Sequence, residues 1–168
     1  ALVMAMLVGT LTACGGSGDK ASENTQADSD AVSSSDGSAV WKIGGIGPLT
    51  GGNAIYGQAA MNGAQIAIDE INAAGGINGY QVAFKYEDDQ ADAEKSVNAY
   101  NSLKDWGMQI LMGSVTTTAC IAVTDKTAED GMFQLTPSAS STDVIINDNV
   151  FQACFTDPNQ GTASAQYI

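Results

Sequence analysis

From residue 40 onward, two patterns of apolar residues take turns along the chain. In one, apolar residues alternate with polar ones or run together, which is typical of strands; in the other, they recur at the spacing of a helix. The run WKIGGIG predicts a buried strand at residues 41–47. A helix is predicted over residues 58–76, where apolar residues from Met61 to Ile71 recur at intervals of three and four. Two glycines follow this pattern and supply its stop.

The same alternation continues to the end of the sequence. The further predicted elements are strands at residues 80–89, 108–113, 132–137 and 149–155, helices at residues 92–107 and 117–130, and the start of a helix at residues 159–168. Asp92 is expected to cap the second helix and Gly107 to end it. Strands that alternate with helices of this length predict an α/β fold built on a parallel sheet.

The first fourteen residues are apolar and uncharged, and they end at Cys14. This run is too short to span a bilayer as a helix, but it has the length and small-residue ending of a signal-peptide core. LTAC at its end resembles a bacterial lipobox, which makes Cys14 the expected lipidation site; the alternative is a buried cysteine. Because no initiator Met or basic segment precedes the run, we expect the natural chain to begin earlier.

Residues 15–39 lack aromatic residues and are dense in Ser, Ala, Gly and Asp. Such a composition cannot bury enough apolar surface to offset the entropy lost on ordering. This segment is therefore predicted to be a disordered tether between a membrane anchor and a folded body.

The chain carries a net charge of −13, contains no histidine, and has lysine as its only cation. This acidity argues against nucleic acid as a partner, because phosphates would stay unneutralised. It also disfavours direct contact with an anionic membrane surface. Without histidine, the commonest general base and metal ligand is lacking, which excludes most hydrolase constellations.

The glycine-rich stretch GGIGPLTGG follows a predicted strand but fits no nucleotide-binding motif. No Gly-Lys-Ser/Thr follows it, and Thr50 stands where the third glycine of G-x-G-x-x-G should be. The acidic residues at positions 87–89, with Asp92, could ligate a metal, although a solvated strand end before a capped helix is the favoured interpretation. Cys120 and Cys154 lack zinc-site spacing and could be buried thiols or a disulfide.

Three loops leave the carboxyl ends of predicted strands, where parallel sheets bind ligands. They are GPLTGGNAIYG, GSVTTTAC and TPSASST, and all are rich in Gly, Ser and Thr. Small polar loops without cations indicate a neutral or zwitterionic small ligand rather than a polyanion. One helix cap uses only one hydroxyl, so three consecutive threonines suggest a further role.

Several of these segments resemble one known family. They are IGGIGPLTGGNAIYGQAAMNGAQIAIDEINAAGGINGYQV, YEDDQADAEKSV, GSVTTTAC, LTPSAS and FTDPNQGTASAQYI. Together they are similar to type I periplasmic-type substrate-binding proteins of ABC transporters, in the branched-chain amino acid (Leu/Ile/Val-binding) group. The resemblance implies two α/β lobes around a ligand cleft. Residues 40–156 would form the first lobe and residues 157–168 would begin a second lobe that is largely missing.

The resemblance also implies an extracytoplasmic, lipid-anchored receptor that delivers an amino acid to an ABC permease and its ATPase, without catalysis and without a cofactor. The tethered-lipoprotein arrangement is that of Gram-positive members. Two alternatives stay open: a ligand-sensing domain of the same fold, and a flavodoxin-like α/β enzyme. The ligand stays open too, with leucine-like amino acids expected ahead of other amino acids, small amides and aromatic acids.

Site residues follow from the resemblance by position. The implied ligand-binding residues are Tyr56, Val115, Thr116, Thr117, Ser138 and Ser140. Thr117 matches the hydroxyl residue that binds the ligand carboxylate, and Ser138 the residue whose carbonyl accepts from its ammonium. The alternative for the threonines is ordinary capping of their own helix, and the alternative for the serines is a Ser-rich turn. Cysteines that form a disulfide near this loop in some members are replaced here by Ala91 and Thr116.

Overall fold

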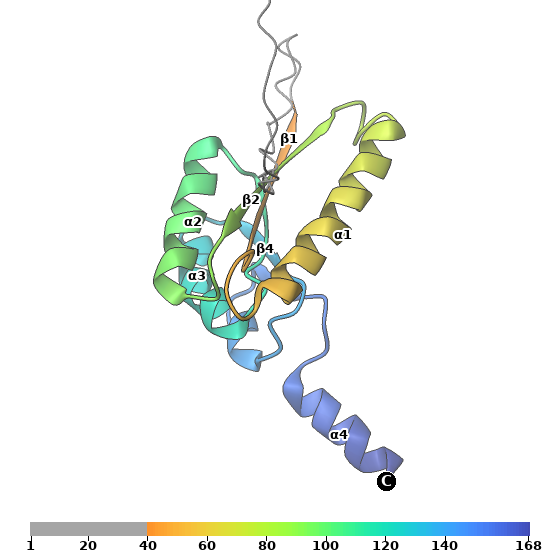
Figure 1. Ribbon diagram of the computed structural model, residues 1–168, viewed down its shortest axis with the longest axis vertical. Coiled ribbons are helices and arrows are strands. Elements are labelled where there is room, and N and C mark those ends of the chain that lie inside the picture. Colours follow the sequence, from red (N-terminus) through yellow and green to blue (C-terminus); the bar gives the residue numbers. More distant parts are fainter. Residues whose placement is uncertain (1–39) are drawn as a thin grey trace, which may run out of the picture. The chain divides into compact units, whose positions relative to one another are not determined.

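The computed structural model describes residues 40–168. The predictions for residues 1–39, including lipidation of Cys14 and the tether, lie outside this range. Within it, strands and helices alternate along the chain (Figure 1). The strands are β1 (Trp41–Gly47), β2 (Val82–Asp88), β3 (Ile110–Met112), β4 (Phe133–Thr136) and β5 (Val150–Gln152). The helices are α1 (Ala54–Ala73), α2 (Ala93–Trp106), α3 (Thr117–Glu129) and α4 (Asp157–Tyr167), with a short 3₁₀ helix η1 (Thr142–Ile145).

All five strands are parallel and lie in the order β2-β1-β3-β4-β5. The chain leaves β1 toward one edge, returns past it to β3, and then continues to the other edge. Helix α1 therefore covers one face of the sheet, and α2 and α3 pack together on the opposite face (Figure 1). This arrangement confirms the predicted parallel α/β fold.

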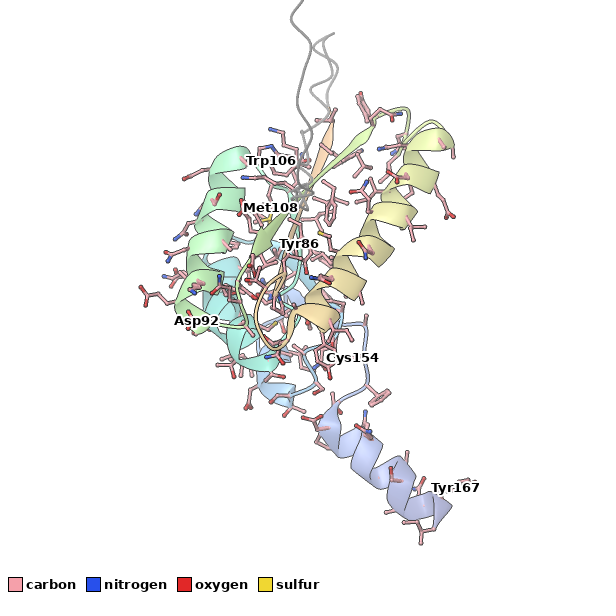
Figure 2. All side chains as sticks on the ribbon, viewed as in Figure 1. Tyr86, Asp92, Trp106, Met108, Cys154 and Tyr167 are labelled. Atoms are coloured by element: carbon pink, nitrogen blue, oxygen red, sulfur yellow. The ribbon has the colours of Figure 1, made fainter. Side chains whose placement is uncertain are left out.

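The helix ends confirm the local signals in the sequence. The Asp92 carboxylate accepts a hydrogen bond from the Lys95 amide at 2.9 Å, which satisfies one unpaired N–H at the start of α2. At the other end of the helix Gly107 adopts a left-handed conformation with φ of 88°. Figure 2 shows Asp92 and Trp106 at these two ends of α2.

Helix α1 begins earlier than predicted, at Ala54 rather than at residue 58. Gly57 lies inside its first turns, where a glycine normally weakens a helix. Here a Cβ at Gly57 would come within 1.9 Å of the Pro48 carbonyl oxygen. Close approach between the helix and the preceding loop explains the glycine, and it places Tyr56 on the helix rather than in the loop.

The apolar core lies between the sheet and the pair α2 and α3. Its buried members are Ile46, Ala99, Tyr100, Leu103, Met108, Leu111 and Val123. Helix α1 contributes less buried apolar surface, since Gly57 and Ile68 are its only buried residues. The side of the sheet under α2 and α3 therefore supplies most of the apolar burial in residues 40–168.

Candidate functional site

A hollow of about 210 Å³ lies at the carboxyl edge of the sheet. It is lined by Asn53, Tyr56, Val115, Thr116, Thr117 and Ser138. These residues come from the three loops that leave β1, β3 and β4, together with the first turns of α1 and α3. The structure thus brings together five of the six residues expected from the sequence.

The first loop is fastened by the carboxylate of Asp88, at the end of the neighbouring strand β2. One Asp88 oxygen accepts from the amides of Leu49 at 2.8 Å and Gln90 at 2.9 Å. The other accepts from the Thr50 hydroxyl at 2.6 Å. Burial alone would raise the pKa of Asp88, but these donors together hold it below its usual value.

The second loop presents the open N-terminus of α3. Thr116 is the N-cap, with φ −97° and ψ 146°, yet its side chain makes no capping hydrogen bond. The Thr116 hydroxyl oxygen is buried and has no partner among residues 40–168. A helix N-terminus also carries unpaired N–H groups and about half a positive charge. The hollow therefore offers hydroxyls and amides, but no cation, to a small anionic group.

The three threonines are placed differently. Thr116 and Thr117 are half-buried and line the hollow, whereas Thr118 is exposed and is not among its lining residues. Val115 is 2% exposed, so it supplies an apolar floor beside the hydroxyls. Tyr56 is 59% exposed and forms a wall that a ligand could cover.

The third loop separates its two predicted residues. Ser138 lines the hollow, but Ser140 is not among the lining residues, and its carbonyl accepts from the Asp157 amide at 3.0 Å. The amide nitrogen of Gln152, on β5, donates to the carbonyls of Ala139 at 2.6 Å and Ser141 at 3.0 Å. These bonds fasten the loop from the strand beside it.

Asn53 lines the hollow and was not predicted. It is the N-cap of α1, and its side chain makes no capping hydrogen bond. Asn is a frequent N-cap residue, so the sequence contained a usable signal. The predicted helix begins at residue 58, so Asn53 fell in the loop of the prediction and its capping position was missed.

Two further polar residues, Tyr86 and Asp89, lie at the carboxyl end of β2. Asp89 is fully buried, and burial raises the pKa of its carboxyl, with a further contribution from the charge of Asp88. Its Oδ1 accepts from the Ala91 amide at 2.9 Å. Burial, with the nearby charges of Asp89 and Asp88, also raises the pKa of Tyr86. The Tyr86 hydroxyl stays protonated and donates to the Gly57 carbonyl at 3.4 Å.

The acidic residues at the end of β2 are occupied by structural hydrogen bonds. Asp88 accepts from the first loop, and Asp92 caps α2, which confirms the predicted cap. Asp89 is fully buried, so the predicted solvated strand end is wrong at that residue. In residues 40–168 no group of three or more Cys, Asp or Glu side chains is arranged to hold a metal ion. Likewise, none of the described helices has the length and apolar character needed to cross a membrane.

The sequence left the state of Cys120 and Cys154 open. Both are free thiols in the structure. Burial raises the pKa of Cys120 to about 11, so this thiol is protonated at neutral pH. Cys120 packs with Ala139 and Val144 as a small buried side chain.

Comparison with known proteins places this site in context. Residues 40–168 match the family described as periplasmic binding protein. The chain is 39% identical over 128 residues to the Leu/Ile/Val-binding protein BraC3 of Rhizobium johnstonii, covering 75% of this chain and 35% of that protein. It is 37% identical over 128 residues to the Leu/Ile/Val-binding protein homolog 3 of Brucella melitensis, with the same coverage. The chain therefore spans about a third of the length of these curated relatives.

Solved structures agree with the sequence matches. The branched-chain amino acid transporter substrate binding protein LivJ from Streptococcus pneumoniae, in complex with isoleucine, is similar with a TM-score of 0.67 and 30% identity. That match covers 71% of this chain and 35% of the other. The leucine binding protein LivK from Thermotoga maritima is similar with a TM-score of 0.69 and 27% identity, covering 76% and 36%.

Proposed function

The chain belongs to the periplasmic binding protein family, and we propose that it is part of an extracytoplasmic receptor that captures a branched-chain or related amino acid. Residues 40–156 form its first lobe, and residues 157–168 begin the second. The receptor delivers its ligand to an ABC permease and its ATPase, and it performs no chemistry on the ligand. The names of the relatives support this ligand class.

The observation that carries the proposal is the uncapped N-terminus of α3 at the hollow. Thr117 donates its hydroxyl and its amide to the ligand carboxylate, and Thr116 contributes its unpartnered hydroxyl. A carboxylate is favoured there because it meets N–H groups and the positive end of the helix dipole without having to displace a side-chain cap. This geometry suits a zwitterion better than a polyanion, since no cation lines the hollow.

The remaining residues orient the rest of the ligand. The Ser138 carbonyl accepts from the ammonium, and Ser140 assists if its hydroxyl turns toward the ligand when the second lobe closes. Tyr56 and Val115 contact the apolar side chain. The hollow, at about 210 Å³, is smaller than the roughly 300–1,000 Å³ of typical small-molecule sites, which is consistent with one wall of a two-lobed site.

The N-terminal segment anchors this receptor. We propose that Cys14 carries the lipid and that residues 15–39 tether the binding lobe to the outer face of the cell membrane, in the Gram-positive manner. Replacing Cys14 with Ser should abolish lipid labelling and release the protein from the membrane fraction. A wild-type protein recovered from the cytoplasm without lipid would contradict the anchor.

The binding site is tested by calorimetry on the full-length protein with leucine, isoleucine, valine and unrelated amino acids. Thr117→Ala should weaken binding by about tenfold to a hundredfold, because it removes a hydrogen bond to a charged group worth about 1.5–3 kcal/mol. Thr118→Ala is the matched control, since Thr118 is exposed and does not line the hollow.

Unfolding must be measured beside affinity, because a threonine near a helix start can also contribute about 1 kcal/mol to stability. A Thr117→Ala protein that loses stability but binds as tightly as wild type would show that the threonines only support the helix. A wild-type protein that binds none of the amino acids would contradict the proposed ligand class.

A further inference from the structure

The loop after β3 is held by two buried side chains of the neighbouring strand β4. Gln134 and Thr136 are both fully buried, and they stand two residues apart, so they point to the same face of the sheet. The amide nitrogen of Gln134 donates to the Gly113 carbonyl at 2.8 Å. The Thr136 hydroxyl donates to the Ser114 carbonyl at 2.7 Å. Two successive carbonyls of the loop thus each accept a hydrogen bond from a buried side chain of β4.

Thr136 differs from Gln134 because its hydroxyl also reaches the next loop. The hydroxyl oxygen accepts from the Ala139 amide at 3.1 Å. A threonine hydroxyl has a single hydrogen to donate, so donation to Ser114 leaves its lone pairs for Ala139. One buried atom therefore bridges the backbone of the β3–α3 loop and the backbone of the β4–η1 loop.

The two bridged positions adjoin the lining of the hollow directly. Ser114 precedes Val115 and Thr116, and Ala139 follows Ser138. Any change in the distance between Ser114 and Ala139 would move Thr116, on one side of the hollow, relative to Ser138, on the other side. A ligand that contacts both sides would then lose at least one of its contacts.

We infer that Thr136 is a positioning residue that sets the spacing between the carboxylate-binding and ammonium-binding halves of the site. The inference rests on the proposed function for the identity of the two halves. Thr136 does not line the hollow, so it acts through the two loops and not by contact with the ligand.

The test compares three variants of the full-length protein. Thr136→Val keeps the side-chain shape and removes the hydroxyl, whereas Thr136→Ser keeps the hydroxyl. Thr124→Val is the matched control: Thr124 is equally buried, at 1% exposed, but its hydroxyl bonds only to Cys120 O of its own helix, at 2.9 Å. Calorimetric affinity for leucine, isoleucine and valine is measured alongside denaturant unfolding.

The expected result is that Thr136→Val binds about tenfold more weakly, that Thr136→Ser recovers most of the affinity, and that Thr124→Val binds like wild type. Both valine variants should lose stability, so stability alone does not separate them. The inference is overturned if Thr136→Val is destabilised to the same degree as Thr124→Val and keeps wild-type affinity. Thr136→Ala serves as a second hydroxyl-free variant if the valine protein does not fold.

Amide hydrogen exchange on the ligand-free protein gives a readout that does not depend on the ligand class. In wild type the Ala139 amide should exchange slowly, because it is bonded to a buried acceptor. Thr136→Val should speed exchange at Ala139 and at Cys120 together, since the Cys120 amide donates to the Thr116 carbonyl of the other loop at 2.9 Å. Thr124→Val should leave residues 138–140 unchanged. Fast exchange of Ala139 in wild type, or a response in only one loop, would refute the bridge even if no amino acid binds.

Discussion

The apolar core beneath α2 and α3 and the carboxyl edge of the sheet are held together by different forces. In the core, side chains such as Leu103 and Leu111 are fully buried within an apolar cluster. At the edge, the three loops are fastened by polar side chains from neighbouring strands: Asp88, Thr136 and Gln152. Apolar burial supplies most of the free energy of folding but has no direction, so it does not fix the positions of individual atoms. Hydrogen bonds are directional, and they set the positions of the loops.

This difference predicts that stability and ligand affinity respond to different residues. A core substitution should lower stability and leave the affinity of the folded molecules unchanged. A substitution at the edge should alter affinity, with effects on stability that depend on which hydrogen bonds it removes. The predictions below test this separation, from the largest expected effect to the smallest.

The largest effect is expected in the core. Leu103→Ala should lower the free energy of unfolding by about 2–5 kcal/mol, because it removes a fully buried side chain and leaves a cavity against its neighbours. Affinity, corrected for the folded fraction, should stay at the wild-type value. Urea unfolding and calorimetry check both quantities, and Leu103→Met is the volume-conserving control. An affinity change in the folded Leu103→Ala protein would break the separation.

Two glycines within α1 separate the effect of contact with the edge loop from the effect of helix propensity. Gly57→Ala should cost about 1–3 kcal/mol, because the new Cβ would meet the Pro48 carbonyl oxygen at 1.9 Å and push the helix start from the loop. Tyr56 would move with it, so binding should weaken as well.

Gly63→Ala is the matched control for this prediction. Gly63 lies in the same helix, and a Cβ there would meet nothing within 4 Å. It should stabilise the protein by about 0.5–1 kcal/mol through helix propensity and leave affinity unchanged. Equal effects of the two substitutions on thermal unfolding would rule out the contact between Gly57 and Pro48 as the cause.

The neighbouring carboxyls of Asp88 and Asp89 predict opposite pH dependences. The pKa of Asp88 is lowered in the folded protein, so the unfolded state holds its proton to higher pH. The stability that Asp88 contributes is present above its ordinary pKa of 3.8 and is lost as pH falls through its folded pKa. The advantage of wild type over Asp88→Asn should therefore shrink in acid. Denaturant unfolding between neutral and acidic pH measures it, and an advantage that does not change with pH would contradict the role of the charge.

Asp89 should behave in the opposite sense. Its pKa is raised mainly by burial, so the folded state holds the proton to higher pH than the unfolded state. The stability of wild type relative to Asp89→Asn should be greatest below pH 3.8 and should fall as pH rises through the folded pKa of Asp89. The same pH series on both variants checks the sign. Parallel slopes for Asp88→Asn and Asp89→Asn would show that one of the two environments is described wrongly.

Local features of the fold were predictable because they depend on residues near each other in the chain. Alternating periods indicated strands and helices, Asp92 and Gly107 marked the ends of α2, and parallel strands required their carboxyl ends to share an edge. The convergence of three Gly, Ser and Thr-rich loops followed from the same argument. The ligand roles of Thr117 and Ser138 stay predictions, although both residues line the hollow.

Other features depended on segments far apart in the chain. Four features have no unambiguous local signal: the place of β1 between β2 and β3, the early start of α1, the lining role of Asn53 and the bond from Asp157 to Ser140. The bridge through Thr136 joins β4 to a loop more than twenty residues earlier, and it exists only because β3 and β4 pair in one register. Sequence periodicity thus determined which elements form and which loops share an edge. Which polar atoms meet across that edge was decided by strand pairing, because a shift of one residue would turn Thr136 to the opposite face.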